Sequence, residues 1–212
     1  MNSKGFLMVT MEPPSAMEEE FNEWYDTEHL PERAAVDGFE TARRYVCLDG
    51  FPRYMAAYDL SSPAVLEGES YRNMAGERFS PWSQRILRKA KGLWRVTGEQ
   101  VYPGQARACE APRLLLLHYR GVPQAAAARL VDELRATYEP HAQVSQLRVI
   151  RYQSGAGEPP GHVALIEGKG SLGALRGPAL EGENGRCIVV ANEYARYWAY
   201  APNPVLGKVL DD

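Results

Sequence analysis

The chain has 212 residues, of which 45% are hydrophobic and 24% are charged, and its formal net charge is −3. This balance is typical of one large or two small globular domains, and it offers no basic excess for nucleic-acid binding. The run Leu114 to Leu117, like the other apolar runs, is far too short to cross a bilayer, so we expect no membrane contact. Cys47, Cys109 and Cys187 form no disulfide or metal pattern, which favours a cytoplasmic location.

The first half of the chain predicts the element order β-α-β-β-α-β. Ser15 and Glu18 match a capping box at the start of the first helix, and Ser62-Pro63 and Ser80-Pro81 are typical starts of later helices. We expect strands at 5–11, 39–48, 53–60 and 93–102, and helices at 15–29, from 62 onward and at 80–90. Residues 103–112 then indicate a linker.

The second half repeats the pattern after about 107 residues, which indicates a duplicated small domain. We expect strands at 114–119, 145–153, 162–167 and 186–199 and a helix at 124–138. The glycine-rich residues 171–185 replace the second helix, and 154–161 form a turn. The predicted organisation is a first unit at 1–104, a second, degenerate unit at 113–200 and a tail at 201–212. The order β-α-β-β-α-β is that of a ferredoxin-like unit.

The first helix carries the main candidate site. Its apolar stripe passes through Phe21 and Trp24, and an α-helical step of about 100° puts Glu28 in the middle of that stripe. The same step puts His29 at the edge of the stripe, beside Tyr25. A carboxylate at a buried helix end is unfavourable, so Glu28 needs a cationic partner, a retained proton or a wet pocket.

Two interpretations of Glu28 and His29 stay open. They can form a general acid/base pair at the mouth of a pocket. Alternatively, Glu28 forms an ion pair with Arg33, Arg43 or Arg44, while His29 caps the last helical carbonyls. The second interpretation needs no ligand.

The aromatic residues of this region have equally ambiguous patterns. Trp24 and Tyr25 can be walls of a pocket for an aromatic ligand, or simply part of the core. Tyr54 and Tyr58 share one face of the third strand and can line the same pocket or pack. Tyr58 is our choice as the ligand contact.

Alternation along the second strand puts Phe39, Arg43 and Tyr45 on one face and Arg44 on the other. If both faces of the sheet are covered, one arginine points into semi-buried space and needs an anion. That anion is either a protein carboxylate or a substrate.

Metal and cofactor motifs are missing from the sequence. His29, His118, His141 and His162 show no short metal-binding spacing, and no nucleotide-binding loop or nucleophile elbow occurs. We therefore predict no metal site and no cofactor.

Several short motifs resemble those of a known superfamily. They are Glu20 to His29 (EFNEWYDTEH), Leu30 to Arg33 (LPER), Gly38-Phe39, Arg43-Arg44-Tyr45 and Ser80-Pro81-Trp82. In these motifs the sequence resembles the dimeric α+β barrel superfamily, especially its EthD-like branch. The likeness in motifs covers residues 5–102, and over 113–200 it is architectural only.

The resemblance implies a fold and a range of functions. In this superfamily two ferredoxin-like units pack sheet to sheet into a barrel, usually from two chains, and here one chain would supply both units. We therefore expect an α+β protein of two tandem ferredoxin-like units with a reduced second helix in the second unit, as a monomer or a loose homodimer. Members include cofactor-independent monooxygenases, isomerases, polyketide cyclases and haem-handling proteins, so the fold does not fix the function.

The leading hypothesis is a pocket in the first unit for a small aromatic or polyketide-like molecule. If the protein is an enzyme, Glu28 and His29 would move a proton, and Tyr25 or Tyr58 would orient the substrate. Trp24 would be a wall of the pocket, and Arg44 would stabilise developing negative charge. The alternatives are a non-catalytic ligand-binding or scaffold protein and a haem-handling protein.

Overall fold

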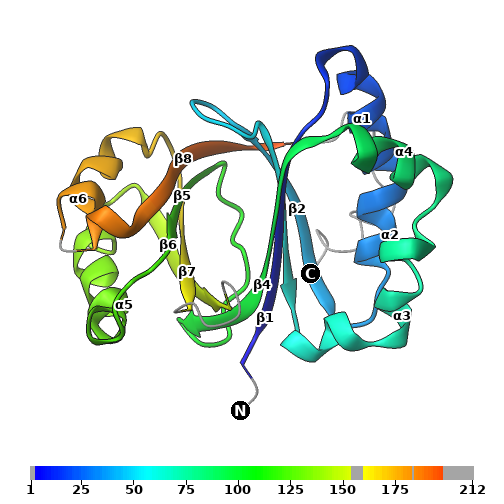
Figure 1. The fold of residues 1–212 in the computed structure, drawn as a ribbon. Coiled ribbons are helices and arrows are strands. Elements are labelled where there is room, and N and C mark those ends of the chain that lie inside the picture. The colour runs from blue at the N-terminus through cyan, green and yellow to red at the C-terminus, as the bar shows by residue number, and fades with distance from the viewer. Residues whose placement is uncertain (1–2, 154–159, 183, 198–212) are drawn as a thin grey trace.

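Eight antiparallel strands close into a barrel (Figure 1). The structure is a computed structural model that describes residues 3–153, 160–182 and 184–197. The strands are β1 (Gly5–Glu12), β2 (Phe39–Cys47), β3 (Tyr54–Leu60), β4 (Lys91–Tyr102), β5 (Arg113–Tyr119), β6 (Val144–Tyr152), β7 (Gly161–Gly168) and β8 (Ile188–Tyr197). Around the barrel they follow the order β1-β3-β2-β8-β5-β7-β6-β4.

Each half of the chain supplies one continuous group of four strands. The first half gives β4-β1-β3-β2 and the second gives β8-β5-β7-β6, so both halves have the same spatial order. The halves join where β2 pairs with β8 and where β4 pairs with β6. In the described chain every strand therefore has a neighbouring strand on both sides, which reduces the risk of edge-to-edge association. The predicted α+β barrel formed within one chain is confirmed.

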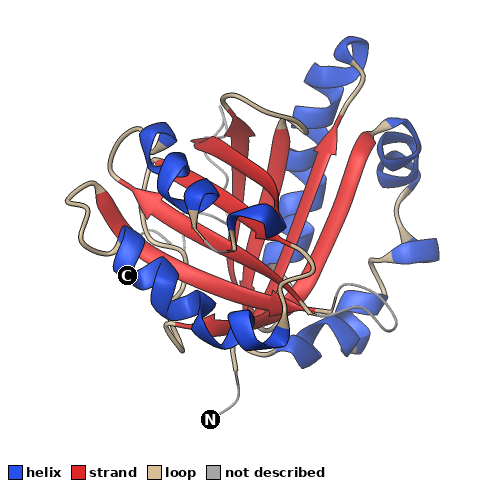
Figure 2. Ribbon diagram, turned by 60° about the vertical axis from the view of Figure 1, so that its left-hand side comes forward, coloured by secondary structure: helices blue, strands red, loops and turns tan. Residues whose placement is uncertain are grey.

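Two helical layers cover opposite sides of the barrel (Figures 1 and 2). The first layer contains α1 (Glu18–Trp24), a π-helical turn (Tyr25–His29), α2 (Leu30–Ala34), α3 (Glu69–Arg72) and α4 (Pro81–Lys89). Short 3₁₀ turns at Ser15–Met17, Pro63–Glu67 and Gly76–Arg78 complete it. The second layer contains α5 (Gln124–Tyr138), α6 (Arg176–Glu181) and 3₁₀ turns at Gly173–Leu175 and Gly185–Cys187. The short α6 confirms the reduced second helix.

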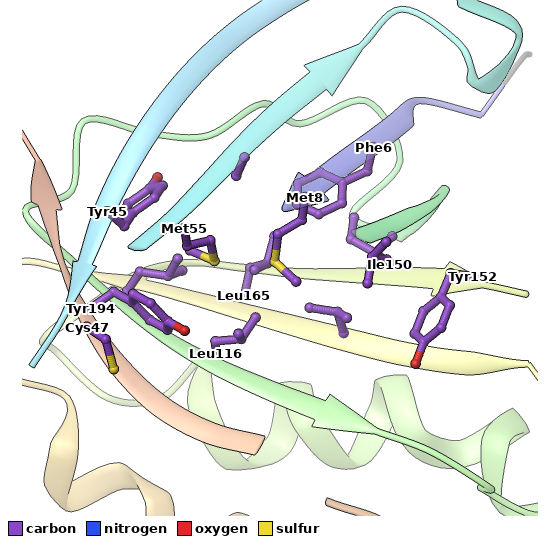
Figure 3. Close-up of a cluster of buried hydrophobic side chains, with 14 residues drawn as sticks. Phe6, Met8, Tyr45, Cys47, Met55, Leu116, Ile150, Tyr152, Leu165 and Tyr194 are labelled. Atoms are coloured by element: carbon purple, nitrogen blue, oxygen red, sulfur yellow. The ribbon is translucent and has the colours of Figure 1, made fainter. Parts of the chain in front are cut away.

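The strands bury both of their faces, so three apolar cores form. Figure 3 shows the barrel interior, which is filled by side chains such as Met8, Leu165 and Tyr194. The opposite faces of the same strands pack under the helices, through Leu7 in the first half and Ala164 in the second. This alternation follows from the period of two along a strand.

A buried ion-pair network lies inside the barrel and involves both halves. Arg148 of β6 donates to Asp59 of β3 at 2.5 Å and to Glu167 of β7 at 3.2 Å. The backbone N–H of Ala108, in the linker, donates to Asp59 Oδ2 at 2.7 Å. The linker is therefore part of the packed structure, and it helps to satisfy the charges inside the barrel.

The predicted first helix needs correction. It does not run as one α-helix from 15 to 29, because residues Ser15–Met17 form a 3₁₀ turn and no side chain caps its start. The Ser15 capping box is therefore wrong. The chain stays helical through Pro31 as far as Ala34, since a proline is tolerated in a first helical turn.

Two further predictions in the first half were wrong in detail. The helix expected after Ser62-Pro63 is a 3₁₀ turn followed by the four-residue α3. Phe39 packs under the helices instead of sharing a face with Tyr45, because the pairing register shifts between Phe39 and Thr41. By contrast, Ser80 caps α4 as expected and accepts a hydrogen bond from Ser83 N.

Some expectations fall outside the described residues, namely most of the 154–161 turn and the 201–212 tail. Across the described ranges, no helix is long and apolar enough to cross a membrane.

Candidate functional site

A π-helical turn sets the geometry of the candidate site. Residues Tyr25–His29 form this wider turn between α1 and α2. A π-helical turn holds more residues than an α-helical one, so every later side chain is rotated back by about one step of roughly 100°. His29 therefore takes the inward position that α-helical periodicity assigned to Glu28. His29 is 9% exposed, and Glu28 is only half-buried.

Glu28 contacts serines of the neighbouring helix. Its Oε1 accepts hydrogen bonds from Ser80 Oγ and from Ser83 Oγ, the latter at 3.1 Å. Both serines belong to the start of α4, where the helix dipole favours an anion. Trp24 Nε1 also donates to Ser83 Oγ, at 3.0 Å. An ion pair of Glu28 with arginine was expected as one alternative, and it is wrong because these hydroxyls hold the carboxylate.

Trp24 and Tyr25 enclose the His29 ring. Trp24 stacks on it with ring centroids 4.3 Å apart, and Tyr25 meets it edge-on at 5.2 Å. Both aromatic residues are almost fully buried. Burial raises the pKa of Tyr25 to about 12, so its hydroxyl keeps its proton at neutral pH.

Arg44 is buried, and strand alternation predicted that one of the two arginines would point into covered space. Its Nη1 donates to Asp26 Oδ1 at 2.7 Å and its Nη2 to Asn22 Oδ1 at 2.6 Å. The guanidinium lies between the rings of Tyr25 and Tyr197, at 4.4 Å and 4.1 Å from their centroids. The anion that Arg44 needs is therefore a protein carboxylate, and its charge is already matched.

Three buried polar atoms between the first helical layer and the sheet have no hydrogen-bond partner among the described residues. They are His29 Nδ1, Arg33 Nη1 and the Tyr58 hydroxyl. His29 and Arg33 come from consecutive turns of the helix, and Tyr58 comes from β3 of the sheet beneath it. Buried polar atoms without partners are rare, so three of them between this layer and the sheet indicate a place for a ligand or ordered water.

Aromatic rings pack between the side chains of His29, Arg33 and Tyr58. The Arg33 guanidinium lies over Tyr71 at 5.3 Å and over Phe79 at 5.7 Å. Phe79 is also 6.4 Å from the His29 ring. On the sheet side, Phe39 packs on Tyr71 and on the Tyr58 ring, with centroids 5.9 Å and 5.6 Å apart. The surroundings are thus apolar and aromatic.

Burial sets the protonation states of His29 and Tyr58. Burial lowers the pKa of His29 well below its usual value, and the nearby charges of Arg33 and Arg44 lower it further. His29 is therefore neutral at physiological pH. Burial raises the pKa of Tyr58 well above its usual value, although Arg33 opposes this, so the hydroxyl stays protonated. The site offers a neutral imidazole, a phenol donor and a guanidinium donor.

Arg33 was missed as a site residue, because it was considered only as a partner for Glu28. One signal could have identified it. Arg33 follows His29 by four residues, so the two side chains lie on one helical face once His29 points inward. The π-helical turn that moves His29 inward leaves no periodic trace in the sequence.

His118, a second buried histidine, does not fit a haem. His118 points into the barrel, where its Nε2 is hydrogen-bonded to the Tyr152 hydroxyl and Trp94 covers its face at 4.0 Å. The ring is already enclosed by side chains. Within the described parts of the chain, no three His, Cys, Asp or Glu side chains gather as a metal site.

A surface hollow of about 300 Å³ lies elsewhere, in the second half. It is lined by Tyr102, Pro103, Glu139 and residues 144–147. Its single carboxylate, Glu139, already accepts a hydrogen bond from Tyr102 and pairs with Arg135. We assign no function to it, since it presents no unpaired charged group.

Comparison with known proteins supports the fold. No family model and no curated protein matches the chain. Among solved structures, an anthrone oxidase-like protein is 13% identical with a TM-score of 0.64, and the match covers 93% of this chain and 92% of that one.

Two further structures are similar over nearly their whole length. A variant chlorite dismutase from Candidatus Nitrospira defluvii is 11% identical, with a TM-score of 0.57 and coverage of 99% and 97%. A proposed monooxygenase from Lactobacillus acidophilus is 6% identical, with a TM-score of 0.55 and coverage of 92% and 94%. At these identities the likeness concerns the fold alone. It agrees with the α+β barrel fold expected from the sequence, and membership of the superfamily and of its EthD-like branch stays a prediction.

Proposed function

We propose that the protein binds a small aromatic or polyketide-like molecule between its first helical layer and the sheet, and transfers protons on it without a cofactor. The unpaired, buried Nδ1 of His29 carries this proposal, because a neutral imidazole among aromatic rings suits the abstraction of a proton. The similarity to an anthrone oxidase-like protein and to a proposed monooxygenase supports the same chemical class.

His29 is the proton acceptor in this proposal. It would take a proton from an acidic C–H or O–H group of the ligand, leaving an anion conjugated with the ring. The negative charge of that anion would stabilise the imidazolium form of His29 beside it. It would thereby raise the pKa that burial lowers in the free protein. If the proton returns to another atom of the ligand, the net reaction is an isomerisation or a cyclisation.

Oxygenation is the related outcome when molecular oxygen meets the same anion. A methylene group then becomes a carbonyl group. One oxygen atom of O₂ enters the product, and the other leaves as water with the two hydrogens. The protein would provide the deprotonation and the apolar surroundings, and O₂ would be the oxidant.

The other candidate residues have supporting roles. Trp24 and Tyr25 would be walls of the site, and Tyr58 would orient the ligand through its free hydroxyl. Glu28 would act as a positioning residue, because its contacts with Ser80 and Ser83 hold the π-helical turn against α4. Arg44 would contribute only its electrostatic field, since Asp26 already pairs with it.

Proton transfer can be tested separately from oxidation. Anthrone is incubated with the full-length protein in D₂O under argon, and NMR follows the exchange of its methylene protons. We expect exchange above the protein-free rate and a loss of about 10²–10⁴-fold of the excess in His29→Gln. The control is His141→Gln, at an exposed histidine of the second half. Equal rates for wild type, His29→Gln and buffer would contradict catalysis on this probe.

A second candidate function is non-catalytic ligand binding. The Glu28 contacts with Ser80 and Ser83 favour it, because they give the Glu-His motif a structural task without any reaction. In this case Glu28→Gln lowers the melting temperature and leaves the affinity for anthrone unchanged. Binding of anthrone without proton exchange would decide for this candidate.

Oligomeric state forms a separate part of the proposal. The barrel closes within one chain, which supports a monomer or a loose homodimer. The repeated strand order likewise supports an origin by tandem duplication. Light scattering that shows a tight dimer at nanomolar concentration would argue against the first point.

A further inference from the structure

Three arginines are buried in the described structure, and only two of them have an ionic partner. Arg44 pairs with Asp26 at 2.7 Å, and Arg148 pairs with Asp59 and Glu167. Arg33 is 2% exposed, about as deeply buried as the other two. Its one hydrogen bond within the described residues goes from Nη2 to the backbone oxygen of Met74, at 2.8 Å.

The carboxylates closest to Arg33 in sequence do not neutralise it. Glu28 is held by Ser80 and Ser83. Glu32 is only half-buried and forms no ion pair with Arg33 within 4 Å. Burial raises the pKa of Glu32, and the charge of Arg33 partly opposes this rise. The guanidinium instead lies against the rings of Tyr71 and Phe79, which attract a cation but do not neutralise it.

An unpaired buried charge is costly, so a folded protein that keeps one usually binds an opposite charge there. The Nη1 of Arg33 and the hydroxyl of Tyr58 are both donors, and neither has a partner in the described chain. They come from a helix and from the strand beneath it, with Tyr71 and Phe39 beside them. Two donors with one positive charge suit an oxyanion.

We propose that Arg33 and Tyr58 bind an anionic oxygen of the ligand, namely a carboxylate, enolate or phenolate attached to an aromatic ring. The aromatic part of the ligand rests on the proposed function, and the oxyanion site rests on the unpaired donors alone. In the proposed reaction the same two donors would stabilise the oxygen on which negative charge develops after deprotonation.

Benzoate is a suitable probe, and benzamide is its neutral counterpart of nearly the same shape. Calorimetry measures the binding of each to full-length wild type, Arg33→Gln and Tyr58→Phe. We expect benzoate to bind wild type at least tenfold more tightly than benzamide. We also expect about 10- to 100-fold weaker benzoate binding in Arg33→Gln and a smaller loss, of about 10-fold, in Tyr58→Phe.

Matched controls separate the site from general effects of charge or of a lost hydroxyl. Arg85→Gln removes the same charge from an exposed side chain of the same layer. Tyr54→Phe removes a hydroxyl from the same strand face, where it contacts Glu18 and Asn22. Both controls should bind benzoate within twofold of wild type. If Arg33→Gln does not fold, Tyr58→Phe with its Tyr54→Phe control still tests the proposal.

Each outcome has a defined meaning. Loss of benzoate binding in the site variants alone supports the oxyanion site, even if anthrone shows no proton exchange. Equal affinities for benzoate and benzamide would overturn it while leaving the aromatic pocket intact. Absence of benzoate binding to wild type, or equal losses in the control variants, would also overturn it.

Discussion

The two helical layers both cover a four-stranded part of the barrel, but they differ in helix geometry and in the side chains that point inward. In the second layer, α5 is an unbroken α-helix whose inward side chains include Leu130 and Leu134, and the hydroxyl of Tyr138 donates to the Leu175 carbonyl at 3.1 Å. In the first layer, a π-helical turn interrupts the helix and brings His29 inward, where its Nδ1 has no partner among the described residues.

This difference separates what the fold requires from what it does not. Both halves place four strands in the same order and cover them with helices. In the second half, His162 Nδ1 and Arg176 Nε are also buried without a partner among the described residues, but Arg176 forms an ion pair with Asp49. Among the buried arginines of the described chain, a missing ionic partner is thus particular to Arg33 of the first layer. The buried polar atoms of the first layer therefore lower stability without helping to build the barrel. A functional role explains them better than a structural one.

The largest expected effect concerns the second helical layer, in which we assign no functional residue. Leu130→Ala should lower the free energy of unfolding by about 2–5 kcal/mol, because it leaves a cavity under α5. Urea denaturation measures the loss. The control is Leu180→Ala, at an α6 side chain that is 51% exposed, with an expected change below about 0.5 kcal/mol. If benzoate binding per folded molecule fell with Leu130→Ala, the two layers would not be independent.

A second prediction concerns a variant in which Arg44, like Arg33, is a buried arginine without a carboxylate partner. Asp26→Ala removes the carboxylate from a buried guanidinium and should cost about 2–3 kcal/mol, less than for a fully buried pair because Asp26 is 19% exposed. Denaturant unfolding gives the value. The control Asp132→Ala removes an exposed carboxylate 3.6 Å from Arg135 and should cost below about 1 kcal/mol. A cost for Asp26→Ala equal to that control would show that a buried arginine needs no carboxylate in this fold.

The sequence predicted the architecture well because strands and amphipathic helices have simple periods. The limits of α5 match the expected 124–138, and alternation identified Tyr45 and Arg44 as residues on opposite faces of β2. These features depend on local patterns of polar and apolar residues, which a single sequence displays directly.

The site was predicted only in part, for two physical reasons. A π-helical turn changes the rotation between residues without changing their order, so His29 and Glu28 exchanged their expected environments. Hydrogen-bond partners from distant segments also have no local signal. Ser80 and Ser83 reach Glu28 from more than 50 residues away in the chain, and Tyr58 approaches the Arg33 region only after β3 pairs in the sheet.

A third prediction compares histidines from the two halves through the pH dependence of stability. Burial lowers the pKa of His118 to about 4, and it lowers that of His29 well below the usual value of about 6.5. Below pH 6.5 the two histidines are therefore protonated in the unfolded chain while they stay neutral in the folded chain. The free energy of unfolding consequently decreases as the pH falls. For His118 this loss continues down to about pH 4.

Each buried histidine should contribute a slope of up to about 1.4 kcal/mol per pH unit in this window. His29→Gln and His118→Gln should each make the acid side of the stability curve flatter, and both together should flatten it most. Denaturant midpoints between pH 4 and 8 measure the slopes. An unchanged slope in His29→Gln would mean that His29 is solvated in the folded state, which would remove the basis for its role as a buried base.

The smallest predicted effect is a change in the free energy of unfolding whose direction distinguishes Tyr58 from Tyr54. Tyr58→Phe removes a buried hydroxyl that has no partner among the described residues, so it should raise the free energy of unfolding by about 1 kcal/mol and the melting temperature by about 2–4 °C. Tyr54→Phe, on the same strand face, should lower stability by about 1 kcal/mol, because its hydroxyl contacts Glu18 and Asn22. Opposite signs for two identical substitutions would show that the Tyr58 hydroxyl is kept at the expense of stability, as expected for a group that contacts a ligand. If Tyr58→Phe were as destabilising as Tyr54→Phe, the hydroxyl would already have a structural partner, such as a buried water, and Arg33 alone would have to bind the anion.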